Sequence, residues 1–204
     1  MLYAHFLLGL LSGTVIAASG TPAHAPIVTL NAPVPEVPFF SQIKDIHSAK
    51  WKNIGCGIAS LAMIIDYYYP GSVSVNTLLK EGIASGAYIK DVGWKHLSLA
   101  RLARPYGLEG MNYDLSSLGK ADAFARFKEF LDKGPLIASV YYKFDPKSPI
   151  PHLVVINGIE GNRVYYNDPA GLAGGKEISV ADFMKGWKKR FIVVRPAQKS
   201  ASTP

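Results

Sequence analysis

The sequence has a single cysteine, Cys56, among its 204 residues. One cysteine excludes a disulfide within the chain, and it excludes zinc sites built from pairs of cysteines. The unpaired thiol therefore has three interpretations: it pairs with another molecule, it is inert and buried, or it is a nucleophile. The sequence also lacks an HExxH motif and its histidines are dispersed, so we expect no metal and no cofactor.

Other missing patterns exclude further classes. The chain has no internal repeat, no P-loop and no dinucleotide-binding glycine pattern. Its net charge is +7, which raises the question of nucleic acid or an anionic surface as a partner. The densest basic run is "KGWKKR" (Lys185–Arg190), and the other lysines and arginines are scattered. We therefore interpret the run as a solvated helix end and expect no nucleic-acid partner.

A membrane-spanning run is missing as well. The charge-free apolar segment Phe6–Ala18 is shorter than the ~20 residues that a spanning helix needs, and small residues follow it. This pattern is typical of a secretory signal. We expect residues 1–25 to be a signal peptide or a short membrane anchor, and the protein to be exported to the periplasm or the cell exterior. Residues 26–196 would then form one domain and residues 197–204 a disordered tail.

The rest of the chain has the composition of a packed domain, with 49% hydrophobic and 18% charged residues. Hydrophobic spacing and turn residues predict helices in the first half and strands in the second. The predicted helices cover residues 56–68, 74–85, 91–104, 120–134 and 179–189. The predicted strands cover residues 37–40, 135–142, the hairpin 152–168, 176–180 and 190–196. This order indicates an α+β fold in which the Cys56 helix packs on an antiparallel sheet.

Cys56 lies at the predicted start of a buried helix. Unpaired backbone N–H groups and the helix dipole favour negative charge at such an end, and the thiolate is the form of cysteine that attacks a carbonyl. We expect Gly55 and Gly57 to leave room for a substrate carbonyl, and the N–H of Cys56 to face a developing oxyanion. The alternative is that Cys56 is a small buried hydrophobic residue.

A leaving amine needs a proton, which a histidine usually supplies. Of the five histidines, His5 and His24 lie in the N-terminal segment, His47 in a predicted loop and His96 in a predicted helix. His152 opens a strong predicted strand, so it is the candidate. Its alternative role is a surface residue at a strand edge.

The predicted hairpin also offers a carboxylate. If residues 160–162 form the loop, His152 faces about Ala170, and Asp168 lies diagonally across on the same face. A shift of one residue in the register would move Asp168 to the other face. The spacing thus permits a His152–Asp168 pair, in which Asp168 would orient the imidazole. The alternative for Asp168 is a turn before Pro169.

Three segments together resemble a known family: "VPFFSQ" (Val37–Gln42), "GCGIASLAMIIDYY" (Gly55–Tyr68) and "PHLVVINGIEGNRVYYNDP" (Pro151–Pro169). They are similar to the C39-like group of papain-superfamily cysteine peptidases, whose members share a VPyxSQ lead, a CGxxSxAMxL helix, an HxVVVxGy strand and a terminal DP. The resemblance spans about residues 34–194. It implies a papain-like α+β fold, with N-terminal helices packed on a C-terminal antiparallel sheet.

The resemblance also implies roles. Cys56 corresponds to the nucleophile, His152 to the general base and acid, and Asp168 to its orienting carboxylate. Gln42 matches the residue whose side-chain amide completes the oxyanion hole. The alternative for Gln42 is a solvated amide in a loop. In the peptidase domains of bacteriocin-exporting transporters the glutamine lies a few residues before the cysteine, where this chain has "SAKWKNIG". This difference argues against cleavage after a double-glycine leader and favours the stand-alone exported type.

Three functions follow from these residues. The first is an exported cysteine peptidase, monomeric and without metal, that hydrolyses peptide or isopeptide bonds through an acyl-enzyme. The second is transfer of the acyl group to an amine, as in transglutaminase-like proteins. The third is a non-catalytic module that binds peptides on a peptidase scaffold. The residues do not identify the substrate or the cleavage preference.

Overall fold

The structure is a computed structural model that describes residues 34–197. The predicted signal peptide or anchor and residues 198–204 of the predicted tail lie outside the described residues. The α-helices of the described part are α1 (Ala49–Lys52), α2 (Cys56–Tyr68), α3 (Val75–Ala84), α4 (His96–Arg101), α5 (Lys120–Leu131) and α6 (Val180–Gly186). No helix between residues 34 and 197 is long and apolar enough to cross a membrane.

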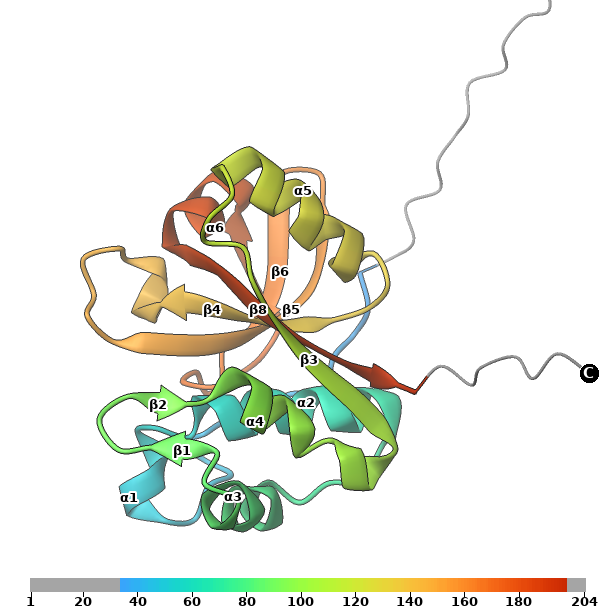
Figure 1. Cartoon of the computed structure of the whole chain (residues 1–204), viewed down its shortest axis with the longest axis vertical. Helices are drawn as coiled ribbons and strands as arrows, with labels where there is room; N and C mark the ends of the chain where they lie inside the picture. The colour runs from blue at the N-terminus through green and yellow to red at the C-terminus, as the bar shows by residue number, and fades with distance from the viewer. Residues whose placement is uncertain (1–33, 198–204) are drawn as a thin grey trace, which may run out of the picture. The chain divides into compact units, whose positions relative to one another are not determined.

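Six of the strands form one antiparallel sheet in the order β3-β8-β4-β5-β6-β7. They are β3 (Leu108–Asp114), β4 (Leu136–Tyr141), β5 (Pro151–Glu160), β6 (Arg163–Asn167), β7 (Lys176–Ser179) and β8 (Trp187–Pro196). A separate small hairpin pairs β1 (Tyr88–Ile89) with β2 (Gly93–Trp94). In Figure 1, α1 to α4 and this hairpin gather below the large sheet, whereas α5 and α6 lie near its upper end. The α+β fold with its antiparallel sheet agrees with the expectation from the sequence.

Helix α2 is apolar on nearly every side, and the structure surrounds it with protein, as such a helix requires. Residues 57–65 are all buried, and they share one core with Leu78 of α3, Leu99 of α4 and Leu153 of β5. The hydroxyl of Ser60 also donates a hydrogen bond of 3.3 Å to the Leu153 carbonyl. The start of α2 is therefore held against the start of β5.

A second core lies between the sheet and the helices α5 and α6. Phe127 and Phe183 are fully buried there, and they pack with Trp187 and Phe191 of β8. Ring centroids lie 4.7 Å apart for Phe127 and Trp187, and 5.4 Å apart for Phe127 and Phe191. These aromatic contacts attach the two helices to the sheet face that α2 does not cover.

The helix predicted from Asp91 starts later. Helix α4 begins at His96, and the preceding residues form the hairpin β1–β2 instead. Asp91 and Gly93 have φ values of 63° and 112°, which a right-handed helix does not allow. This turn places Trp94 against the start of α2, where its indole N–H donates a hydrogen bond of 2.6 Å to the Ile54 carbonyl.

Two strand predictions also need correction. Residues 37–40 form no strand, because Pro38 has no N–H for a ladder. The carbonyls of Val37 and Pro38 instead accept hydrogen bonds from the Asn167 amide, at 2.9 and 3.4 Å. Conversely, β3 was not predicted, since Gly110 and Asn112 are poor strand formers. It pairs with β8 along all seven of its residues.

Candidate active site

Cys56 is the first residue of α2, and its side chain is half-buried. Gly55 precedes it as the N-cap residue and, having no side chain, supplies no cap hydrogen bond to the helix. The N–H groups of the first helical turn have no acceptor within the helix, so they remain available near the sulfur. Cys56 lies in a cavity of about 540 Å³ that His152 and Gln42 also line. The thiol is thus open to a ligand at the positive end of a helix.

The two glycines beside Cys56 are needed for close packing. A Cβ atom on Gly57 would lie 2.9 Å from both Trp94 and Leu99, and one on Gly55 would collide with Ile46. Protein side chains therefore occupy the space that a Cβ on either glycine would need. The glycines allow the start of α2 to pack closely, which fixes the position of Cys56.

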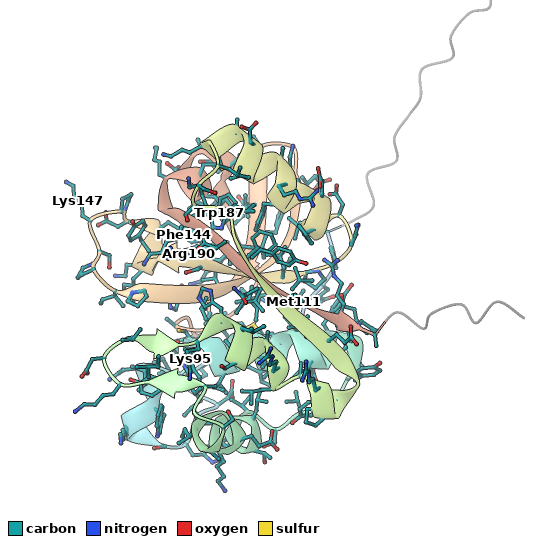
Figure 2. All side chains as sticks on the ribbon, in the orientation of Figure 1. Lys95, Met111, Phe144, Lys147, Trp187 and Arg190 are labelled. Atoms are coloured by element: carbon teal, nitrogen blue, oxygen red, sulfur yellow. The ribbon has the colours of Figure 1, made fainter. Side chains whose placement is uncertain are left out.

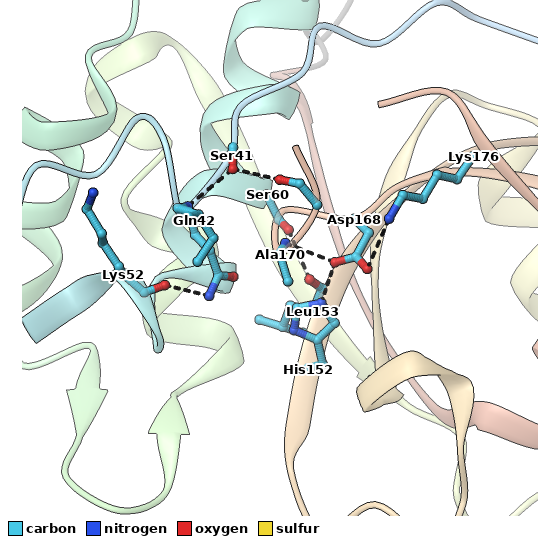
Figure 3. A network of polar contacts seen from close by, with 11 residues as sticks. Ser41, Gln42, Lys52, Ser60, His152, Leu153, Asp168, Ala170 and Lys176 are labelled. Atoms are coloured by element: carbon cyan, nitrogen blue, oxygen red, sulfur yellow. Dashed lines mark hydrogen bonds and ion pairs between the residues drawn. The ribbon is translucent and has the colours of Figure 1, made fainter. Parts of the chain in front are cut away.

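His152 and Asp168 form a direct pair. The Nε2 atom of His152 lies 2.7 Å from Oδ1 of Asp168, and both side chains are largely buried (Figure 3). The backbone N–H of Ala170 donates to the same Asp168 oxygen at 3.0 Å, and Lys176 lies 3.7 Å from the other oxygen. Because Nε2 of the His152 ring is paired with Asp168, the ring nitrogen left to face the Cys56 sulfur is Nδ1.

The hairpin reaches this pairing through an irregularity. At the turn Glu160 faces Arg163, so the loop has two residues instead of the three that we expected. The register then shifts between Ile156 and Gly158, after which Val155 faces Asn167. Asp168 consequently falls on the face of His152. Without the bulge at Asn157 it would lie opposite Val155, on the other face.

The charges of the pair reinforce each other. Burial disfavours a charged imidazole, but hydrogen bonds with Asp168 and Cys56 outweigh it and raise the pKa of His152 to about 9. Burial likewise disfavours the Asp168 carboxylate, yet its hydrogen bond with His152 lowers the pKa of Asp168. The site therefore favours an imidazolium held between the carboxylate and the sulfur at neutral pH.

Gln42 is not a solvated loop amide. Its side chain is 4% exposed, and its Nε2 atom donates a hydrogen bond of 2.6 Å to the Lys52 carbonyl. The backbone N–H of Gln42 donates to the Pro169 carbonyl at 2.8 Å, next to Asp168. Figure 3 shows the Gln42 amide on the side of the helices, facing His152 on the side of the sheet. One N–H of the amide is thus fixed by Lys52, and Gln42 lines the cavity that contains Cys56.

Several residues that hold the site together escaped the sequence analysis. The Ser41 hydroxyl donates to the Gly171 carbonyl at 2.7 Å, which ties the Gln42 segment to the loop after Asp168. The buried Asn167 side chain contacts Val37 and accepts a hydrogen bond of 2.8 Å from the Gly175 N–H. Both residues directly precede a candidate site residue in the sequence, which is the only signal that pointed to them.

Of the four remaining histidines, one of those that the structure describes lies near the candidate site. His5 and His24 lie outside the described residues, and His47 is exposed in the loop before α1. His96 lines the same cavity as Cys56, although the sequence analysis set it aside as a helix residue. Between residues 34 and 197, no group of three or more histidine, cysteine, aspartate or glutamate side chains has the arrangement of a metal site.

The sequence model of the peptidase C39-like family matches residues 34–193, most of the chain. The chain belongs to the peptidase C39-like family. Peptidase C39-like proteins also appear among solved structures with this fold. A search of curated proteins found no match.

Three crystal structures illustrate the likeness. A double-glycine-motif protease from an AMS/PCAT transporter, in complex with its leader peptide, is 26% identical, with 79% of this chain and 93% of that chain covered and a TM-score of 0.55. The peptidase domain of Streptococcus ComA is 19% identical, with 79% and 100% covered and a TM-score of 0.57. A C39-like peptidase from Bacillus anthracis is 17% identical, with 81% and 96% covered and a TM-score of 0.59. The latter two show that this chain shares the fold of C39 peptidase domains.

Proposed function

We propose that this protein is a cysteine peptidase in which Cys56, His152 and Asp168 act as a catalytic triad. The observation that carries the proposal is the His152 imidazole, which is paired with Asp168 at 2.7 Å and lines the same open cavity as Cys56. Membership of a peptidase family supports it. A peptide is the proposed substrate because the transporter protease, at 26% identity, is in complex with its leader peptide.

The proposed reaction has two halves. The Cys56 sulfur attacks the carbonyl carbon, and His152 gives its proton to the leaving amine as the C–N bond breaks. Water then attacks the resulting thioester, and His152 takes a proton from it, so that the acid is released and the thiolate returns. Asp168 keeps the imidazole oriented throughout. The Cys56 N–H and the second N–H of Gln42 would stabilise the oxyanion in both halves.

We propose export as well, on the apolar segment and small residues before residue 26. Cell fractionation followed by N-terminal sequencing of the full-length protein tests this. Mature protein in the exported fraction with a new N-terminus is expected for a signal peptide. Uncut protein in the membrane fraction indicates an anchor, and uncut protein in the cytoplasmic fraction contradicts export.

The catalytic proposal is tested by labelling Cys56 with a peptide electrophile at neutral pH and detecting the adduct by mass spectrometry. The native protein should be labelled, and His152→Ala should lose most of this reactivity because the imidazolium is the one full positive charge that we assign to stabilising the thiolate, beside the weaker effect of the helix end. His47→Ala, a change at an exposed loop histidine, serves as the matched control. Equal labelling of the His152 variant would remove His152 from the mechanism. Amine acceptors added to the peptide assay detect acyl transfer as a distinct product.

Gln42→Ala separates the oxyanion hole from thiol activation. Loss of one oxyanion donor lowers kcat by roughly a hundredfold in such sites. Alkylation by iodoacetamide forms no oxyanion, so its rate should stay near that of the native protein. Peptide hydrolysis and iodoacetamide labelling are measured on the same preparation. Parallel losses of both rates would mean that Gln42 acts by positioning Cys56.

A further inference from the structure

A second cavity of about 440 Å³ lies at the start of β8. Its lining includes the cationic cluster, which we define as Lys120, Lys185, Lys188, Lys189 and Arg190. No acidic side chain of the described residues lines it. The sequence analysis treated most of this cluster as a solvated helix end. In the structure α6 ends at Gly186, so the last three of these residues belong to β8.

An irregular stretch of backbone presents these lysines. Ser139 of β4 faces Arg190, whereas the next residue, Val140, faces Trp187, so Lys188 and Lys189 form a bulge. Figure 2 labels Trp187 and Arg190, the residues that precede and follow the bulge in β8. Lys189 has a φ of 56°, which is uncommon for a residue other than glycine. Bulges of this kind redirect side chains and are frequent beside active sites.

The hydrogen bonds of the bulge leave one lysine available. The Lys189 ammonium donates to the carbonyls of Ser116 and Leu118, at 2.6 and 2.7 Å, and so anchors the bulge. The Lys188 ammonium lies 4.5 Å from the centre of the Tyr141 ring. No acidic group within residues 34–197 lies within ion-pair distance of Lys188.

Carboxylates of the protein neutralise only part of the cluster. Arg190 pairs with Asp114 at 2.8 Å through Nε, and Lys185 pairs with Asp182 at 2.7 Å. Both pairs are exposed, so solvent weakens them. The outer nitrogens of Arg190 and the whole Lys188 ammonium therefore remain free to bind an anion from outside.

The cluster adjoins the active-site cavity. Ser139, which faces Arg190, lines that cavity, and Tyr142 lines it while the preceding Tyr141 lines the second one. The pKa of His96 is lowered by burial and then by the positive charge of Arg190; the Asp114 carboxylate opposes this shift, and Lys188 adds a smaller lowering effect. A chain bound beside Cys56 and extending past His96 would therefore meet Lys188 and Arg190.

We propose that Lys188 and Arg190 bind a carboxylate of the peptide substrate, and so make an acidic group at one fixed distance from the cleaved bond a determinant of specificity. This inference rests on the proposed peptidase function. Two sources supply such a carboxylate: an aspartate or glutamate side chain, or the C-terminus of a short peptide. Peptides with free and amidated C-termini distinguish them.

The test is cleavage-site profiling of a degenerate peptide library with the full-length protein, in free-acid and amidated forms. Native protein should enrich aspartate and glutamate over asparagine and glutamine at one position by roughly three- to tenfold, as for a charged hydrogen bond at a half-buried site. A preference confined to free-acid peptides would assign the carboxylate to the C-terminus. In either case the preference should shrink at high salt, because ions screen the attraction.

Two variants decide whether the cluster is responsible. Lys188→Met keeps an unbranched side chain over Tyr141 but removes the charge, and it should abolish the acidic preference. Lys128→Met is the matched control, since Lys128 also lies over an aromatic ring, Phe124 at 5.5 Å, but lines neither cavity. Cleavage without an acidic preference, or a preference that both variants retain, would overturn the specificity proposal but leave the peptidase function standing. No cleavage of any peptide would instead refute the peptidase function, and this proposal with it.

Discussion

At the scale of single residues, the charge on His152 makes stability depend on pH. The pKa of His152 in the folded protein is about 9, above its ordinary value of 6.5. The stability that this group contributes is therefore fully present below pH 6.5 and is lost as the pH rises through 9. For Asp168 the pKa is lowered, so its contribution is present above the ordinary carboxyl pKa and is lost at more acidic pH.

We predict that native protein loses on the order of 3 kcal/mol of unfolding free energy between about pH 6 and pH 10 from His152 alone. His152→Gln lacks the ionisable ring, so its unfolding free energy should change less over the same range. Urea titrations at the two pH values, on both proteins, give the comparison. Equal losses in the two proteins would show that His152 is not protonated in the fold.

The sequence analysis chose candidate site residues that the structure brings close together: Cys56, His152 and Gln42 line one cavity, and Asp168 pairs with His152. It could choose them because a helix start, a strand start and hairpin spacing are local features of a sequence. The packing role of Gly57 was missed, since the side chains that it contacts, Trp94 and Leu99, come from more distant elements. Close packing between distant segments leaves no local pattern.

At the scale of elements, the position of Cys56 depends on how tightly α2 fits against its neighbours. Gly57→Ala places a methyl group 2.9 Å from Trp94 and Leu99. We predict a loss of about 1–3 kcal/mol in unfolding free energy, as for other overpacked sites. Gly119→Ala is the control, because its Cβ would meet only Asp122, at 3.4 Å. Chemical denaturation measures both, and equal stability of the two variants would contradict tight packing at α2.

The elements that the sequence misplaced share one cause. Strand β3 is fixed by its pairing with β8, whereas residues 88–94 pair with each other and are anchored from outside through Trp94, whose indole N–H donates to the Ile54 carbonyl. Helix α2 and strands β4 and β5 were predicted closely, since their apolar runs have clear ends. Local propensity thus predicted the elements with long apolar runs. It failed for the elements whose structure is determined by contacts with another segment.

At the scale of the whole described part, two separate cores meet at the sheet, and the candidate site belongs to the first. Phe127 is fully buried in the second core. Phe127→Ala should lower the unfolding free energy by about 3–5 kcal/mol because of the cavity it leaves. The rate at which native, folded protein reacts with iodoacetamide at Cys56 should stay unchanged. A change in that rate under fully native conditions would show that the second core also positions the site.

The bulge at Asn157 has a consequence for comparing this protein with its relatives. One additional residue in β5 determines on which side of the sheet the carboxylate after β6 emerges. A hairpin of the same length with regular pairing would bring the residue after the aspartate, and not the aspartate itself, to the face of the histidine. A homologue that simply lacks the extra residue keeps the register beyond it, so its aspartate still lies diagonally across from the histidine. The strand register at this point, and not the position in a sequence alignment alone, therefore decides whether a relative retains the pair.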